Sequence, residues 1–397
     1  MTPADTSRPR LPATIWALGF VSLLMDVSSE MIHALLPVYM VTVLGVSAFT
    51  VGLIDGLAEA TAMIVKVFSG ALSDRWGRRK PLAVLGYAMG AASKPLFALA
   101  SGAGLVFGAR IIDRIGKGIR GAPRDALVAE SAPPGMRGAA FGLRQSLDTV
   151  GAFLGPLLAV ALMLLWANDY QRVFWVAVIP GVLAVLLLLV AVREPARAPG
   201  RRAVNPISRT QLARLPAAYW WVVGVGAVFT LARFSEAFLV LRAQQGGVAP
   251  AWIPLVLVGM NIVYAASAYP LGKLADRMDH RSLLALGMVV LIAADVALAI
   301  GNTGPWLWAG IALWGLHMGL TQGLLAAMVA DTAPADLLGT AYGFFNLMSG
   351  LALLVASATA GLVWDQLGAA ATFAVGAGFA TLALVMLVWL GGALARR

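Results

Sequence analysis

The residues of this sequence that could do chemistry are charged side chains set at helical spacing inside apolar segments. The densest group falls in segment 104–129, where seven charges share an arc of about 140° if each residue turns the helix by about 100°. An ionisable group inside a membrane span costs several kcal/mol, so such a face is expected to line protein or a water-filled cavity. The seven residues are Arg110, Asp113, Arg114, Lys117, Arg120, Arg124 and Asp125.

Two pairs of carboxylates have a spacing that suits proton exchange. Asp26 and Glu30 lie one helical turn apart, and so do Asp55 and Glu59. Carboxylates at this spacing repel each other, which favours proton binding by one of them, and an approaching arginine favours its release. Both pairs are candidates for proton coupling, and Asp26 with Glu30 is preferred. The alternative is that they only neutralise the bases of 104–129.

Polar residues elsewhere extend the candidate solute-binding site. Arg144 and Asp148 are four residues apart, which suits an ion pair on one helix face. The apolar segments of the first half contain eight bases and seven acids, so this set is nearly neutral. Arginine binds carboxylate and phosphate with paired hydrogen bonds, which favours an anionic or zwitterionic solute. The candidate solute-binding residues are Arg110, Asp113, Arg114, Lys117, Arg120, Arg144, Asp148, Arg233, Glu236, His317, Gln322 and Asn346.

These side chains belong to a chain with the composition of a membrane protein. Of its 397 residues 60% are apolar and 12% are charged, against roughly half and a quarter in soluble domains, which excludes a soluble enzyme. A span needs about 20 apolar residues, and twelve stretches qualify, so the predicted fold class is an all-α integral membrane protein. The stretches are 13–40, 48–73, 81–101, 104–129, 139–165, 172–192, 217–242, 250–274, 283–301, 304–331, 338–364 and 368–393.

The positions of the basic residues predict the orientation of these spans. Lys and Arg accumulate in short cytoplasmic loops, and with twelve spans most loop arginines, including those of 75–80 and 193–214, fall on one side. We therefore expect a multi-pass protein of a bacterial-type cytoplasmic (inner) membrane with both termini cytoplasmic. Because this topology explains much of the net charge of +10, no nucleic-acid partner is predicted.

Enzymatic and metal sites have no support in the sequence. It has no phosphate-binding glycine loop, nucleophile elbow or zinc-protease motif, so neither an enzyme nor a cofactor is predicted. With no cysteine and three histidines, the chain also lacks a typical metal-ligand pattern.

An internal repeat divides the chain into two halves. At a shift of 201 or 202 residues the segment GALSDRWGRRK, beginning at Gly70, aligns with GKLADRMDHR, beginning at Gly272. We predict two six-span bundles, 1–192 and 217–397, joined by a cytoplasmic loop at 193–216. The same shift places apolar or uncharged residues opposite the charges of 104–129, so those charges are not needed for the architecture alone.

The repeated segment resembles the loop signature of the major facilitator superfamily. Arg110 in GARIIDRIGKG is similar to that family's fourth-span arginine motif, although Asp113 and Arg114 replace its usual Gln-Gly pair. The fifth span resembles the family's antiporter motif, but Ala159-Val160 replaces the terminal glycine pair. The resemblance implies two pseudo-symmetric six-helix bundles, alternating access and bacterial proton-coupled export. The motif residues are Gly142, Gly151, Gly155 and Pro156, and for them close helix packing is preferred over a role specific to antiport.

The two copies of the loop signature are candidates for gating the cytoplasmic side. A carboxylate among arginines can hold two bundles together in one state and release them in another, and Glu130 is the expected partner of the first basic cluster. The alternative is that these charges only set the topology. The candidate gating residues are Gly70, Asp74, Arg75, Arg78, Arg79, Glu130, Gly272, Asp276, Arg277 and Arg281.

Taken together, the sequence predicts a monomeric secondary transporter that exports a small polar, anionic or amphiphilic solute in exchange for protons. The partners are then the solute, protons and the lipid bilayer. Alternatives within transport are a broad-range drug efflux pump and an organic-anion importer or symporter. A non-transporting receptor or a lipid flippase is a further alternative.

Overall fold

The computed structural model describes residues 11–76, 78–133, 135–194, 209–275, 278–301, 303–321, 323–334 and 337–394, and these residues form helices and short connections without a strand. The first half contains α1 (Ala13–His33), α2 (Leu36–Thr42), α3 (Ala48–Trp76), α4 (Lys80–Ala98), α5 (Ala103–Ser131), α6 (Arg137–Leu165) and α7 (Tyr170–Ala191). The second half contains α8 (Arg209–Leu212), α9 (Ala217–Ala232), α10 (Ala237–Gln245), the short 3-10 helix η1 (Pro250–Trp252), α11 (Leu255–Ala275), α12 (His280–Ile300), α13 (Gly304–Thr321), α14 (Leu324–Thr332), α15 (Leu338–Leu367) and α16 (Ala369–Leu394).

Ten helical stretches of the described residues are long and apolar enough to cross a membrane. The two further predicted spans are α4 and α5, which carry charges within their length, Lys80 and Lys94 in α4 and eight residues in α5. A charged span is tolerated where other helices cover its polar face. The all-α membrane fold with twelve spans predicted from the sequence is therefore confirmed. In two of these spans the charged residues lower the hydropathy.

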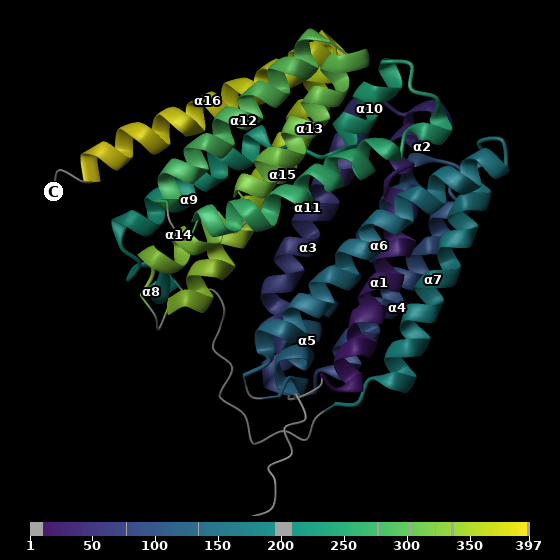
Figure 1. Cartoon of the computed structure of the whole chain (residues 1–397), viewed down its shortest axis with the longest axis horizontal. Coiled ribbons are helices and arrows are strands. Elements are labelled where there is room, and N and C mark those ends of the chain that lie inside the picture. Colours follow the sequence, from purple (N-terminus) through teal and green to yellow (C-terminus); the bar gives the residue numbers. More distant parts are fainter. Residues whose placement is uncertain are drawn as a thin grey trace, which may run out of the picture.

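The helices form two bundles (Figure 1). In the first, α1 packs against α6 and α7, and α5 packs against α3 and α4. In the second, α12 packs against α13 and α16, and α9 packs against α15 and α16. The bundles meet mainly along α3 and α15, with a smaller contact between α6 and α11. They diverge toward the ends of α5 and α14 in Figure 1.

Three spans are interrupted near their middle. The breaks lie at residues 34–35 between α1 and α2, at 233–236 between α9 and α10, and next to Gly323 between α13 and α14. Gly323 has φ +75°, a left-handed conformation that glycine adopts without steric cost. Non-helical backbone at membrane depth is tolerated where it is buried in protein or lines a cavity, so these breaks direct attention to the space between the bundles.

Contacts between α3 and α15 close one end of the space between the bundles. Asp365, near the end of α15, accepts hydrogen bonds from the backbone N–H groups of Ala48 (3.0 Å) and Phe49 (2.8 Å), at the start of α3. A Cβ at Gly361 would lie 2.5 Å from the carbonyl oxygen of Ala48, so the two helices approach within backbone contact there. We call this end, which includes the connections 43–47 and 246–254, the closed end.

The opposite end of each bundle is held by an equivalent ion pair. Arg79 Nε lies 2.9 Å from Glu130 in the first bundle, and His280 Nδ1 lies 3.1 Å from Asp331 in the second. The two pairs are related by a shift of 201 residues, the shift found in the sequence repeat. The repeat therefore extends from sequence to side-chain contacts.

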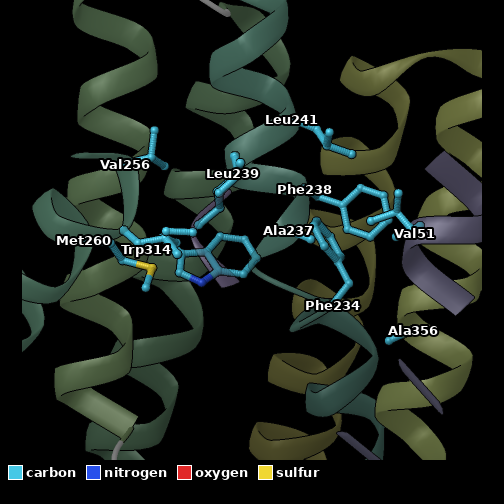
Figure 2. Close-up of a cluster of buried hydrophobic side chains, with 14 of the residues drawn as sticks. Val51, Phe234, Ala237, Phe238, Leu239, Leu241, Val256, Met260, Trp314 and Ala356 are labelled. Atoms are coloured by element: carbon cyan, nitrogen blue, oxygen red, sulfur yellow. The ribbon is translucent and has the colours of Figure 1, made fainter. Parts of the chain in front are cut away.

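An aromatic cluster fills the second bundle behind the break between α9 and α10 (Figure 2). The ring of Phe234 lies 5.5 Å from the rings of Phe238 and Trp314 and 5.6 Å from that of Phe373. Val51 of α3 reaches the same cluster from the first bundle (Figure 2). Aromatic packing thus supports the break from one side while the other bundle covers it.

Replacement of Asp365 by Ala is expected to favour a state in which the closed end is open. Loss of a helix cap costs about 1 kcal/mol, which would raise the open fraction roughly fivefold. Because the chain has no cysteine, spin labels on introduced cysteines at Val43 and Leu367, both well exposed, can report the distance between the bundles.

Asp169→Ala is the matched control for this experiment. Asp169 also caps a helix, accepting a 3.1 Å hydrogen bond from the Arg172 backbone N–H, but within one bundle. It should leave the distance distribution unchanged. If Asp365→Ala also leaves the distribution unchanged, the Asp365 contact does not hold this end closed.

Candidate functional site

A cavity of about 550 Å³ lies between the two bundles and is the candidate functional site. Both bundles contribute polar side chains to its wall. Residues that lie in or next to each of the three helix breaks also line it. The first bundle supplies Glu30, His33, Asp55, Glu59, Arg110, Arg114 and Lys117. The second supplies Thr230, Arg233, Ser235, Glu236, Thr321, Asn346 and Ser349.

Asp55 links the two bundles at the centre of this cavity. Arg110 contacts Asp55 Oδ1 through Nη2 at 2.8 Å and Nε at 3.0 Å, and Ser235 Oγ donates a 2.8 Å hydrogen bond to Asp55 Oδ2. Asp55 is 5% exposed, so its charge depends on these partners rather than on bulk water. The residue was predicted as a proton-coupling acid, and the structure places it in a contact that must break if the bundles separate here.

Arg114 is the centre of a second charged group in the first bundle. Its Nη2 lies 3.2 Å from Glu59 Oε1 and 3.2 Å from the ring nitrogens of His33. His33 Nδ1 in turn lies 3.5 Å from Glu30. The predicted face of the fourth span therefore meets the predicted acidic faces of the first and second spans in one network.

Asp113 has a partner outside the cavity. It accepts a 2.7 Å hydrogen bond from Lys94 Nζ, which also donates to Ser29 Oγ at 3.0 Å, and both charged groups are almost completely buried. Asp113 was a candidate for solute binding, whereas the structure gives it the role of balancing Lys94. A helical wheel cannot show this, because the deciding partner lies on another helix.

Lys117 differs from the other bases of α5. It is exposed to the cavity and has no hydrogen-bond or ion-pair partner among the described residues. It lies one turn from Arg114, whose own charge is matched by Glu59. An ammonium group in this position can accept an acidic solute without first giving up a protein partner.

Three other predicted solute-binding residues of the first bundle do not line the cavity. The guanidinium of Arg120 lies 4.6 Å from the centre of the Tyr87 ring, a cation–π contact inside the bundle. Arg144 and Asp148 form the predicted i, i+4 ion pair at 3.6 Å. Arg124 also approaches Asp148, at 3.9 Å. These placements favour structural roles over direct solute contact.

The preferred proton-coupling pair is divided between two environments. Glu30 lines the cavity, whereas Asp26 lies in the contact between α1 and α6. A Cβ at Gly151 would lie 3.1 Å from Asp26 Cβ, and one at Gly155 would lie 2.8 Å from Glu30 Cβ. The two glycines, with Pro156 next to the second, thus let α6 lie directly against the acids of α1. Gly142, by contrast, faces open space.

In the second bundle the predicted polar wall is only partly present. Arg233, Glu236 and Asn346 line the cavity, and Arg233 lies 5.6 Å from the centre of the Phe229 ring. His317 is instead fully buried, edge-on to Trp314 at 5.4 Å, and does not line the cavity. Gln322 lies outside the described residues.

Of the candidate gating residues, Arg79 and Glu130 make the expected pair, and Arg79 Nη1 also donates to Ser73 Oγ at 2.8 Å. Arg75 and Arg78 are exposed, and Arg281 lies 5.2 Å from the Trp221 ring centre. Gly70 and Gly272 lie near the ends of α3 and α11. The Asp74 side chain, Asp276 and Arg277 fall outside the described part of the chain.

Comparison with known proteins identifies the family. A model described as Major Facilitator Superfamily matches residues 18–246 and 237–394. The chain belongs to the major facilitator superfamily. An MFS-type transporter of Methanocaldococcus jannaschii is 32% identical over 388 residues, 96% of this chain and 95% of that relative. A multidrug resistance protein MdtH of Edwardsiella ictaluri is 26% identical over 344 residues, 84% of this chain and 81% of the relative.

Solved structures of other superfamily transporters share the fold. A mutant of the peptide transporter POT aligns with TM-score 0.80 at 17% identity, covering 97% of this chain and 95% of the other. A mutant of the nucleoside transporter NupG aligns with TM-score 0.77 at 14% identity, covering 94% and 99%. At these identities the likeness concerns the fold alone.

Within this superfamily fold, sequence reasoning missed several polar residues. Ser235 and Asp365 join the two bundles. Neither could be recognised from the sequence, because Ser235 carries a single hydroxyl group and Asp365 is a single acid near the end of a span. Asp295 was detectable, because it is the one charge inside the apolar 283–301 span. Among the described residues, no group of three or more His, Asp or Glu could hold a metal ion.

Replacement of Lys94 by Met is expected to destabilise the protein by roughly 3–5 kcal/mol, because it removes the nearest counter-charge of buried Asp113 and leaves only the longer contact with Arg114 Nε, at 3.8 Å. The double variant Lys94→Met/Asp113→Leu should recover most of this loss, since apolar residues of similar volume replace a buried pair at little cost. Thermal unfolding in detergent measures both.

Lys66→Met serves as the control, because Lys66 is exposed and lies outside the cavity. It should unfold at the wild-type temperature. A Lys94→Met protein as stable as wild type would show that the Asp113 charge is not sustained by Lys94.

Proposed function

We propose that this protein moves a small anionic or zwitterionic solute across the membrane by alternating access. The observation that carries the proposal is the cavity between the bundles, where Lys117 on one wall and Arg233 and Glu236 on the other have no ion-pair partner among the described residues. Its walls belong to elements that can separate, since Asp55–Ser235 and Asp365–α3 are bonds between bundles. Breaking them would open the closed end while the opposite ends approach.

The charge pattern of the cavity supports this solute class. Four acids and four permanent bases line it, so its formal charge is balanced. Asp55 and Glu59 are neutralised by Arg110 and Arg114, which leaves Lys117 and Glu30 on one wall, with Glu30 next to His33. On the other wall Arg233 and Glu236 have no ion-pair partner among the described residues. A solute with a carboxylate or phosphate near Lys117 and a second polar group can therefore bridge the bundles.

The sidedness of the protein follows in this proposal from the arginines. The junction between α3 and α4 carries Arg75, Arg78, Arg79 and Lys80, and it lies at the end opposite the closed end. Placed on the cytoplasmic side by the positive-inside rule, this loop makes the closed end the external one. In this proposal the protein lies in the cytoplasmic membrane, and both of its termini lie on the cytoplasmic side.

Export in exchange for protons is the direction we favour. Support comes from the relatives named multidrug resistance proteins, at 26–29% identity, and from the glycine contact between α6 and the acids of α1. In this scheme Glu30, in the cavity beside His33 and Arg114, exchanges the proton when solute occupies Lys117. Asp26 lies against α6, and motion of α6 relative to α1 would change its surroundings.

Lys117→Gln tests the solute site. Loss of a charged hydrogen bond of about 1.5–3 kcal/mol should raise the KM for an acidic solute roughly tenfold to a hundredfold, measured by counterflow in proteoliposomes with a panel of organic acids and zwitterions. Lys66→Gln makes the same charge change away from the cavity and should not alter KM. Equal KM values in both variants would remove Lys117 from solute recognition.

Glu30→Gln and Asp26→Asn test proton coupling separately. The double variant is expected to retain solute exchange and lose movement driven by a pH gradient, because neither amide can carry a proton between compartments. The two single variants show which acid is required. Gradient-driven transport at the wild-type level in the double variant would exclude both acids from coupling.

A further inference from the structure

A carboxyl group without a partner lies inside the second bundle. Asp295 of α12 is 0% exposed, and neither of its side-chain oxygens has a hydrogen-bond partner among the described residues. The space for the group is provided by Gly376 of α16, where a Cβ would lie 2.7 Å from Asp295 Oδ2. An unpaired carboxylate in such surroundings is very costly, so the group is neutral here and carries a proton.

No charged neighbour compensates Asp295 in the described part of the chain. Helix α16 contributes no titratable group, and the titratable groups of the other elements around α12 have different contacts. His317 packs on Trp314, Asp331 pairs with His280, and Arg242 donates to the carbonyl oxygens of Leu298 and Ala299. The segment 233–236 contributes Arg233 and Glu236, which face the cavity. A proton is therefore the simplest ligand for Asp295 in this state.

Phe234 separates this carboxyl group from the cavity. The same hypothetical Cβ at Gly376 would lie 2.9 Å from Phe234 Cε1, so the ring and the carboxyl group share one small space. Phe234 also belongs to the cavity wall, with Trp314 beside it (Figure 2). Phe234 is therefore a residue that contacts both the cavity and the space that holds the carboxyl group.

The residue after Phe234 connects this cover to the opposite bundle. Ser235 donates its hydroxyl to Asp55 of α3 at 2.8 Å, and Phe234 and Ser235 both lie in the unwound segment between α9 and α10. Separation of the bundles at the closed end must break this bond, which leaves the segment held only from within its own bundle, where the Ser235 backbone N–H donates to Ser357 Oγ at 3.1 Å. The contact that holds the bundles together and the cover of Asp295 are therefore adjacent residues of one short, non-helical stretch.

We propose that Asp295 is a proton-binding site of the second bundle, occluded by Phe234 in the state shown and exposed when Ser235 leaves Asp55. The carboxylate takes one proton from water and returns it to water, with no other reactant. The inference rests on the proposed alternating access, and it places a proton site in the bundle opposite to Asp26 and Glu30. Ser235 then links bundle separation to proton exchange.

Labelling with dicyclohexylcarbodiimide, which adds to protonated carboxyl groups in apolar surroundings, tests the site without a known solute. Peptide mass mapping of the purified full chain is expected to find the adduct on Asp295, and Phe234→Ala should speed its formation several-fold. Phe345→Ala, which removes an aromatic ring from the cavity wall on α15, should not. Absence of the adduct from Asp295 in both wild type and Phe234→Ala, across the pH range in which the protein stays folded, would overturn the proposal.

Transport by Asp295→Asn provides the second measurement. This isosteric change should leave solute exchange within about twofold of wild type and abolish accumulation driven by a pH gradient, whereas Asp331→Asn should preserve both. Gradient-driven accumulation at the wild-type level in Asp295→Asn would refute the site, even where Lys117→Gln confirms the cavity. Failure of wild-type exchange with every solute would instead count against the proposed function, and the labelling result would still decide whether Asp295 holds a proton.

Discussion

The structure depends on the rule that a charge inside the membrane needs a partner. Asp55 with Arg110, Glu59 with Arg114 and Asp113 with Lys94 satisfy this rule with contacts of 2.7–3.2 Å between different helices. These pairs fix how α3, α4 and α5 lie against one another, because separating them would strand charge in a medium of low dielectric constant. They also determine which groups remain available, and Lys117 is such a group.

The same rule distinguishes permanent contacts from contacts that can change. Pairs within a bundle, such as Asp113 with Lys94, can persist through any rigid-body motion of the two bundles. Asp55 is different, because it binds Arg110 in its own bundle and Ser235 in the other. When the bundles separate, Asp55 loses the hydroxyl of Ser235 but keeps the counter-charge of Arg110. The bond between the bundles can therefore break without breaking an ion pair.

The two bundles contribute different kinds of side chain around one cavity. The first contributes most of the charge, and the second contributes Arg233, Glu236 and aromatic rings around Phe234, with Asp295 buried outside the cavity wall. A charged wall can select a polar solute, while an aromatic wall can exclude water until it moves. In the proposed transport cycle, the asymmetry visible in the sequence repeat divides solute recognition in the first bundle from occlusion in the second.

The sequence by itself determined the number of spans, the repeat and the polar faces of the first, second and fourth spans, because these follow from helical periodicity and from the cost of charge in lipid. A helical wheel shows on which side of its own helix a residue lies, but it does not show which neighbouring helix packs against that side. Only the tertiary structure therefore decided that Asp113 pairs with Lys94, that Arg120 packs on Tyr87, and that Asp55 reaches Ser235, which is 180 residues away. The closed end was likewise beyond the sequence, because the bond from Asp365 to the start of α3 joins residues more than 300 positions apart and exists only when the two bundles meet there.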